Sequence, residues 1–194
     1  MHQDNLEVLQ TWQSPSQLYA QADAAIDSIN LAQLDSNPAK PFKESWVIGR
    51  AGSILGAKRA RWTDEDQPDG YLDFGSSGPI PIEVTEQLHE GRRRGDEDAT
   101  ATMIQYQVEL DAAIECNRTW LEGRVTAKLA KDHLYPRGTV LLIYHNSSLY
   151  NFDPERTRSE LEDVSMLSRG NIVGSLILKG EEVYGRRTIE RIRE

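Results

Sequence analysis

The segment QPDGYLDFGSSGPIPIEVTEQ, residues 67–87, restricts the fold more than any other part of the chain. It holds two short runs rich in aromatic and β-branched residues, and the glycines and serines of GSSG separate them. This pattern predicts a β-hairpin with a loop of about four residues. Asp69 opens the first run and Glu83 lies inside the second. The hairpin therefore places acidic side chains in an otherwise apolar setting.

Four other segments have apolar residues at helical spacing. The first begins with Ser14 as N-cap before a proline, and the last begins in the same way with Asp153. Two glycines in the second segment weaken the case for one uninterrupted helix. The expected helices cover residues 14–34, 42–62, 99–132 and 153–167.

Two strand patterns lie in the second half of the chain. The continuous apolar run in TVLLIYHN, residues 139–146, predicts a buried strand. The segment 171–185 predicts a final hairpin that turns near Gly180, followed by a short charged tail. Strands that alternate with helices predict an α/β fold with a mixed central sheet flanked by helices. We expect a helical extension over residues 1–40 and one α/β domain over residues 41–194.

Composition limits the classes of function. The 194 residues are 38% hydrophobic and 27% charged, which is typical of a folded globular chain. A formal net charge of -9 argues against a protein that coats nucleic acid through bulk charge, although a local basic groove remains compatible with it. The single cysteine, Cys116, excludes an intramolecular disulfide and a CxxC zinc site. The chain also lacks GxSxG, P-loop and HExxH motifs.

Two further features concern the location of the protein. The N-terminal residues lack a basic flank followed by an apolar core, so we expect no signal peptide. The longest apolar run, TVLLIY, is too short to span a bilayer. We therefore expect a soluble, cytoplasmic protein with no membrane partner.

The register of the hairpin selects the partner of Glu83. If GSSG forms the turn, residue 70 lies opposite Glu83, and Asp69 is within one position of it. Asp73 is nearer the turn, and at ~3.3 Å per residue it lies roughly 10 Å or more from Glu83. We expect Asp69 and Glu83 to form a carboxylate pair and Asp73 to be solvated.

Two acidic residues on adjacent buried strands are unfavourable unless a cation neutralises them. A divalent metal ion is the usual solution. The carboxylates of Asp69 and Glu83, together with the carbonyl oxygen of Val84, are hard ligands that suit Mg²⁺ or Mn²⁺. Such an ion can activate water and stabilise charge on a phosphoryl group.

These residues resemble the PD-(D/E)XK nuclease superfamily, which has the restriction-endonuclease-like fold. The resemblance rests on PD, an apolar run, a turn and then IEVT at residues 82–85, and the order of elements extends it over residues 43–146. It implies a three-layer sandwich and metal-dependent cleavage of nucleic-acid phosphodiester bonds, with DNA as the expected substrate. It also implies that Asp69 and Glu83 bind the metal and that Glu44 is a helper carboxylate.

One position departs from the pattern of that family. The family has a lysine two residues after the glutamate, where this chain has Thr85. Alternation along a strand puts Thr85 beside Glu83, where its hydroxyl can place a water but carries no positive charge. Lys128 or Lys131, on the helix before the buried strand, could supply that charge. The alternatives are a nuclease-like fold that no longer cuts and acts as a binding or interaction module, and a coincidental match.

Two basic runs, KRAR and RRR, flank the hairpin in the sequence. They predict phosphate contacts beside the metal site, or alternatively a solvated surface whose charge is balanced by nearby acids. Nucleic acid is the expected partner, and a homodimer is one alternative for the oligomeric state. The basic residues concerned are Lys58, Arg59, Arg61, Arg92, Arg93 and Arg94.

Overall fold

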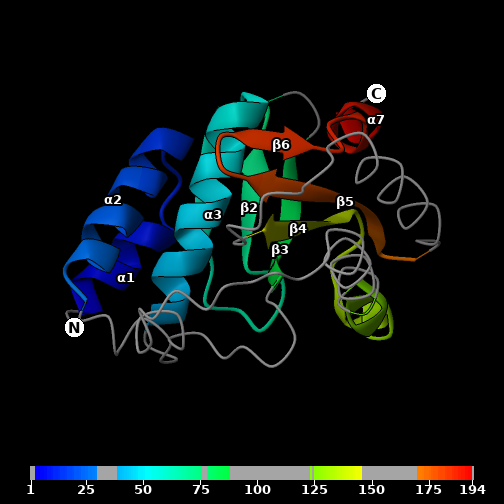
Figure 1. Cartoon of the computed structure of the whole chain (residues 1–194), viewed down its shortest axis with the longest axis horizontal. Coiled ribbons are helices and arrows are strands. Elements are labelled where there is room, and N and C mark those ends of the chain that lie inside the picture. The colour runs from blue at the N-terminus through cyan, green and yellow to red at the C-terminus, as the bar shows by residue number, and fades with distance from the viewer. Residues whose placement is uncertain are drawn as a thin grey trace, which may run out of the picture.

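A computed structural model of the chain describes residues 3–29, 39–75, 78–87, 123, 125–145 and 170–193. Within these residues the fold is α/β and contains a six-stranded mixed sheet (Figure 1). The helices are α1 (Gln3–Gln10), α2 (Pro15–Asp27), α3 (Lys40–Leu55), the helical residues 125–129, the 3-10 turn η3 (Asp132–Leu134) and α7 (Arg187–Arg193). The strands are β1 (Arg59–Trp62), β2 (Gly70–Asp73), β3 (Pro79–Gln87), β4 (Thr139–His145), β5 (Ile172–Lys179) and β6 (Glu182–Tyr184).

The strands follow one another across the sheet in chain order. β1, β2 and β3 form an antiparallel meander, β4 is parallel to both β3 and β5, and β6 is antiparallel to β5. The predicted α/β class with a mixed sheet is therefore confirmed. The predicted hairpin at residues 67–87 and the final hairpin that turns at Gly180 are confirmed as well. Gly180 has a φ of 56°, which glycine adopts without steric strain.

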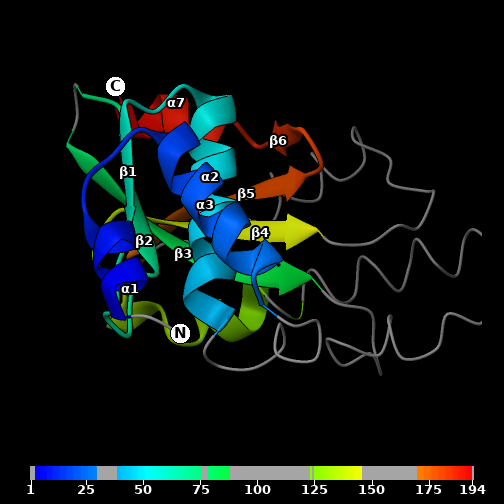
Figure 2. The same cartoon turned by 90° about the vertical axis from the view of Figure 1, so that its left-hand side faces the viewer.

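Helices cover both faces of the sheet. In Figure 2, α2 lies in front of α3, and α3 lies in front of the strands. Residues 125–129 lie on the other side of the sheet in Figure 1. β4 is apolar without interruption because its alternate residues are buried on opposite faces, Leu142 on the α3 side and Leu141 against Val125.

The predicted second helix is too long at its C-terminal end. α3 ends at Leu55 because Gly56 adopts a left-handed φ of 76° and caps it, and residues 59–62 then form β1. The charged tail is also wrong in part, since residues 187–193 form α7. The predicted start of the first helix is confirmed, because Ser14 caps α2 in a capping box. α1 lies within the expected helical extension, but it was not predicted as a separate helix.

Within the described residues, no helix is long and apolar enough to cross a membrane. Several predicted segments lie outside these residues. The segments and residues outside are 153–167, most of 99–132, Cys116, Arg92, Arg93 and Arg94.

The contact between α2 and α3 provides a test of the packing. A Cβ atom on Gly49 would lie 2.6 Å from the backbone nitrogen of Tyr19 and 2.8 Å from the carbonyl oxygen of Pro15. Backbone atoms cannot move aside as a flexible side chain can, so Gly49→Ala is expected to lower the free energy of unfolding by about 1–3 kcal/mol. Urea denaturation measures the change, and unaltered stability would contradict this close helix packing.

Candidate active site

The register of the first hairpin brings Asp69 opposite Glu83. Gly70 pairs with Ile82, so the residue before β2 faces the residue after Ile82. The register predicted from the sequence, with GSSG as the turn, put residue 70 opposite Glu83 instead. Asp73 pairs with Pro79, and the loop therefore covers residues 74–78, one residue more than assumed. The corrected register strengthens the predicted pair of Asp69 and Glu83.

Asp69 is fixed by the strand that carries Glu83. One of its oxygens, Oδ2, accepts a hydrogen bond from the Val84 N–H at 2.8 Å. The backbone of Asp69 is also bonded to the residue that follows β1, because its carbonyl oxygen accepts from the Thr63 N–H at 3.1 Å. Both Asp69 and Glu83 are only 4% exposed. The structure therefore holds two acidic side chains in a setting where an isolated charge is unfavourable.

A lysine contacts Glu83 from the helical residues 125–129, which pack on the face of the sheet opposite α3. The Lys128 Nζ lies 2.5 Å from Glu83 Oε1, and the hydroxyl of Tyr135 lies 3.5 Å from the same oxygen. The other oxygen, Glu83 Oε2, is buried and has no hydrogen-bond partner among the described residues. One carboxylate oxygen is thus neutralised, while the second is left as a buried acceptor.

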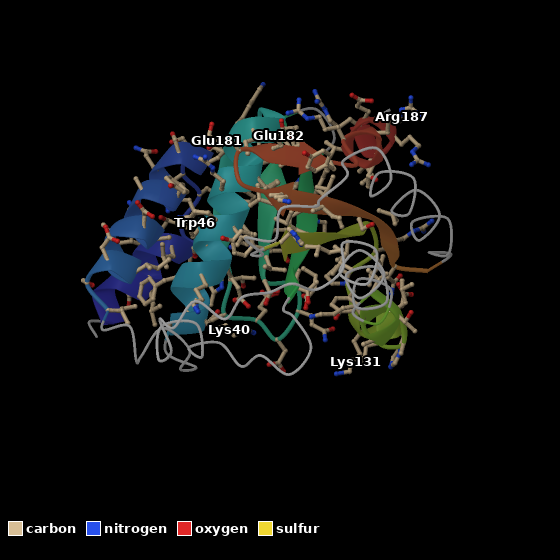
Figure 3. All side chains as sticks on the ribbon, in the orientation of Figure 1. Lys40, Trp46, Lys131, Glu181, Glu182 and Arg187 are labelled. Carbon is tan, nitrogen blue, oxygen red and sulfur yellow. The ribbon has the colours of Figure 1, made fainter. Side chains whose placement is uncertain are left out.

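Glu44 adds a third carboxylate from α3. It is 7% exposed, and its Oε2 accepts a hydrogen bond from Trp62 Nε1 at 3.0 Å. Lys40 lies one helical turn earlier, and its Nζ is 3.2 Å from Glu44 Oε1 and 3.7 Å from Asp69 Oδ1. Figure 3 shows Lys40 at the N-terminal end of α3. Lys40 therefore joins the carboxylate on the helix to the carboxylate on the hairpin.

The pKa values show how strongly these charges interact. Burial, followed by the charge of Asp69, raises the pKa of Glu44 from 4.5 to about 7. The same two causes raise the pKa of Glu83. Burial alone would lower the pKa of Lys40, but the charges of Glu44 and Asp69 outweigh it and the net shift is upward. The site therefore favours added positive charge, or a proton on one of its carboxylates.

Tyr135 is held as a neutral hydrogen-bond donor. Burial and the charge of Glu83 raise the pKa of its hydroxyl. The phenol therefore keeps its proton and can donate it in a hydrogen bond to Glu83. This contact fixes the orientation of the glutamate from a segment that the sequence pattern marked only as the end of a helix.

The oxygen atoms of the site are of the type that a hard divalent cation prefers, but few protein ligands are available. Asp69 and Glu83 offer carboxylate oxygens, and Glu83 Oε2 receives no hydrogen bond from the part of the chain that the structure describes. No group of three or more histidine, cysteine, aspartate or glutamate residues in the described ranges is arranged to hold a metal ion. Mg²⁺, however, is commonly bound through one or two carboxylates and completes its shell with water and substrate phosphate oxygens. Asp69 and Glu83 are the residues that would hold it.

The two predicted lysines are placed differently. Lys128 contacts Glu83, whereas Lys131 is exposed and lies on the outside of the molecule in Figure 3. Thr85 is buried two residues after Glu83, on the same face of β3. The backbone N–H of Val84 donates a hydrogen bond to Asp69. The role of the Val84 carbonyl oxygen as a metal ligand stays a prediction.

The expectation that Asp73 is solvated is wrong. Asp73 is buried, and its Oδ2 accepts hydrogen bonds from Arg59 Nη2 at 2.5 Å and Arg59 Nε at 3.0 Å. The Gly75 N–H donates to Oδ1 at 2.7 Å. These bonds, those from Arg59 first, lower the pKa of Asp73. An ion pair with the neighbouring strand, which the sequence assigned to a helix, explains the burial.

Three residues of the site were not predicted: Lys40, Trp62 and Tyr135. Lys40 precedes Glu44 by four residues, a spacing that favours an ion pair once α3 is recognised. Trp62 was assigned to the end of a helix, and no sequence signal places its indole against Glu44. Tyr135 lies in YPRG, whose proline and glycine indicate a turn and conceal a buried side chain.

Comparison with family models, curated proteins and solved structures found no match. The function is therefore inferred from the residues of the site.

Proposed function

We propose that this protein is a Mg²⁺- or Mn²⁺-dependent nuclease of restriction-endonuclease-like architecture that hydrolyses phosphodiester bonds in DNA. One observation carries the proposal. The Lys128 Nζ lies 2.5 Å from Glu83, which faces Asp69 across the hairpin. This lysine, from the following helix, can supply the positive charge that Thr85 lacks, and the cluster then combines two carboxylates with one ammonium group.

Each residue has a distinct task in this proposal. Asp69 and Glu83 would hold the cation through their carboxylate oxygens. When bound, Mg²⁺ or Mn²⁺ supplies activation of the attacking water and stabilisation of phosphoryl charge. Lys128 places a positive charge where negative charge develops on the phosphoryl oxygens. The charge needs no reorganisation during the reaction because Glu83 already holds the ammonium group in place.

The remaining residues position these groups. Tyr135 orients Glu83 through its hydroxyl, and Thr85 offers a second hydroxyl on the same face of β3. Glu44, with a pKa of about 7, exchanges a proton near neutral pH and is the helper carboxylate. Lys40 limits the repulsion between Glu44 and Asp69.

Asp69→Asn tests the assignment of the metal site. The substitution keeps an oxygen for the Val84 N–H but removes the charge, so Mg²⁺ affinity is expected to fall at least about tenfold, with loss of cleavage. Isothermal titration calorimetry measures binding, and conversion of plasmid and single-stranded DNA with Mg²⁺ or Mn²⁺ measures cleavage. Wild-type cleavage should stop in EDTA. Unchanged Mg²⁺ binding by Asp69→Asn, or cleavage in EDTA, would contradict the proposal.

One observation favours a second candidate function, a non-catalytic binding module with a nuclease-like fold. Lys40 and Lys128 already form ion pairs with the cluster, so a divalent cation competes with two resident charges. A protein of this kind would bind nucleic acid or protein without Mg²⁺ and would show no cleavage with either metal. The calorimetric and cleavage measurements separate the two functions.

A further inference from the structure

A second cluster of side chains consists of arginine and aromatic residues, not of carboxylates. The guanidinium of Arg61 lies 5.3 Å from the ring centroid of Trp12 and 4.8 Å from that of Tyr71. The two rings are 6.3 Å apart and tilted by 52°. Trp12 reaches this position because the next residue, Gln13, bridges to Ala60 at the edge of β1. We call Trp12, Arg61 and Tyr71 the cation–aromatic cluster.

Arg61 differs from its neighbour in how its charge is balanced. Arg59 also lies over Trp12, at 5.1 Å, but the buried carboxylate of Asp73 neutralises it. Arg61 forms no ion pair with any residue that the structure describes, and its Nε is buried without a hydrogen-bond partner there. Its guanidinium is therefore held in place by rings rather than by an anion. A guanidinium group held in this way can bind a phosphate, because its planar N–H donors can form two parallel hydrogen bonds to phosphate oxygens.

The cation–aromatic cluster lies on the same face of the sheet as Glu83. Arg61 pairs with Tyr71, and Tyr71 pairs with Pro81, so the three residues form one row across β1, β2 and β3. Glu83 follows Pro81 by two residues and points to the same face. Strand geometry places the Cα of Glu83 about 8 Å from that of Tyr71 and about 12 Å from that of Arg61. A ligand on the cluster would reach the carboxylates without crossing the sheet.

We infer that the cation–aromatic cluster binds a single strand of DNA and delivers it to the carboxylates, so that the substrate class is single-stranded rather than duplex DNA. This inference rests on the proposed nuclease function. Aromatic rings can stack on bases only when the bases are unpaired, and an arginine that has no ion-pair partner among the described residues can contact the adjoining phosphate. The acidic chain, with its net charge of -9, suits a local contact of this kind better than the wide basic surface that a duplex requires.

Binding without cleavage tests the inference. Fluorescence anisotropy in EDTA would compare labelled oligo(dT) with a duplex of the same length. The single strand is expected to bind at least about tenfold more tightly, and Arg61→Gln is expected to weaken that binding about tenfold or more. The matched control is Arg50→Gln, because Arg50 lies 5.3 Å from the ring of Tyr19 on the α3 side. Arg50→Gln should leave the affinity unchanged.

A second measurement separates stacking from a merely structural role. Oligo(dT) should quench tryptophan fluorescence in the wild type, whereas Trp12→Phe should keep the affinity within about threefold and lose most of the quenching. Equal or tighter binding of the duplex, no binding of oligo(dT), or an affinity that Arg61→Gln does not alter would overturn the inference. Because no metal is present, single-strand binding by a protein that fails to cleave would refute the nuclease function alone.

Discussion

Lys128→Met and Glu83→Gln are each expected to lower the rate of metal-dependent cleavage by about 100-fold or more. Among the residues that the structure describes, the Lys128 ammonium group is the positive charge that pairs with Glu83. Removal of one preorganised group that stabilises transition-state charge typically has an effect of this size. Methionine retains much of the length and apolar character of the lysine side chain. Single-turnover cleavage of labelled DNA under saturating Mg²⁺ measures the rate without a contribution from product release.

The double variant and the second lysine make this expectation specific. If Lys128 and Glu83 act as one unit, the variant with both substitutions should be little slower than the slower single variant. Lys131→Met is the matched control, because Lys131 is three residues further along the chain and exposed. A rate for Lys128→Met within about threefold of the wild type, or an equal loss in Lys131→Met, would contradict the role of Lys128.

The pair of Asp69 and Glu83 was predictable because a hairpin is a local structure. Turn residues and alternation fix which positions face each other, and an error of one residue in the loop left the pairing intact. The choice between Lys128 and Lys131 could not be predicted in this way. Forty-five residues separate Lys128 from Glu83, and only the placement of a helix on the far face of the sheet decides which lysine reaches the glutamate.

β1 illustrates a different limit. The residues RARW look helical when read as a continuation of α3, because alanine and arginine favour helices and the strand is only four residues long. Their burial nevertheless alternates along the strand, with Ala60 and Trp62 facing the core and the arginines facing outward. Gly56 was the available signal, since a glycine after the last apolar helical residue often ends a helix. The error concealed both Trp62 beside Glu44 and Arg59 beside Asp73.

Glu44→Gln is expected to change how stability depends on pH. The pKa of Glu44 is about 7 in the folded protein and about 4.5 in the unfolded chain, so the folded state binds the proton more tightly. The favourable contribution of this proton is complete below pH 4.5, declines as pH rises and is lost above about pH 7. A shift of this size corresponds to about 3 kcal/mol. Glutamine stays neutral and still offers an oxygen to Trp62, so the variant lacks this loss.

The measured quantity is the free energy of unfolding of Glu44→Gln minus that of the wild type, from urea denaturation at several pH values. It should rise between pH 4.5 and about 7 and then level off. Glu181→Gln is the control, because this glutamate is exposed and its ion pair with Arg50 lies at the surface. A difference that does not change with pH would show that Glu44 is not held in a charged cluster.

Added Mg²⁺ is expected to change the same quantity. A cation bound by Asp69 and Glu83 would offset the repulsion on Glu44, so above pH 7 it should reduce the difference in free energy of unfolding between Glu44→Gln and the wild type.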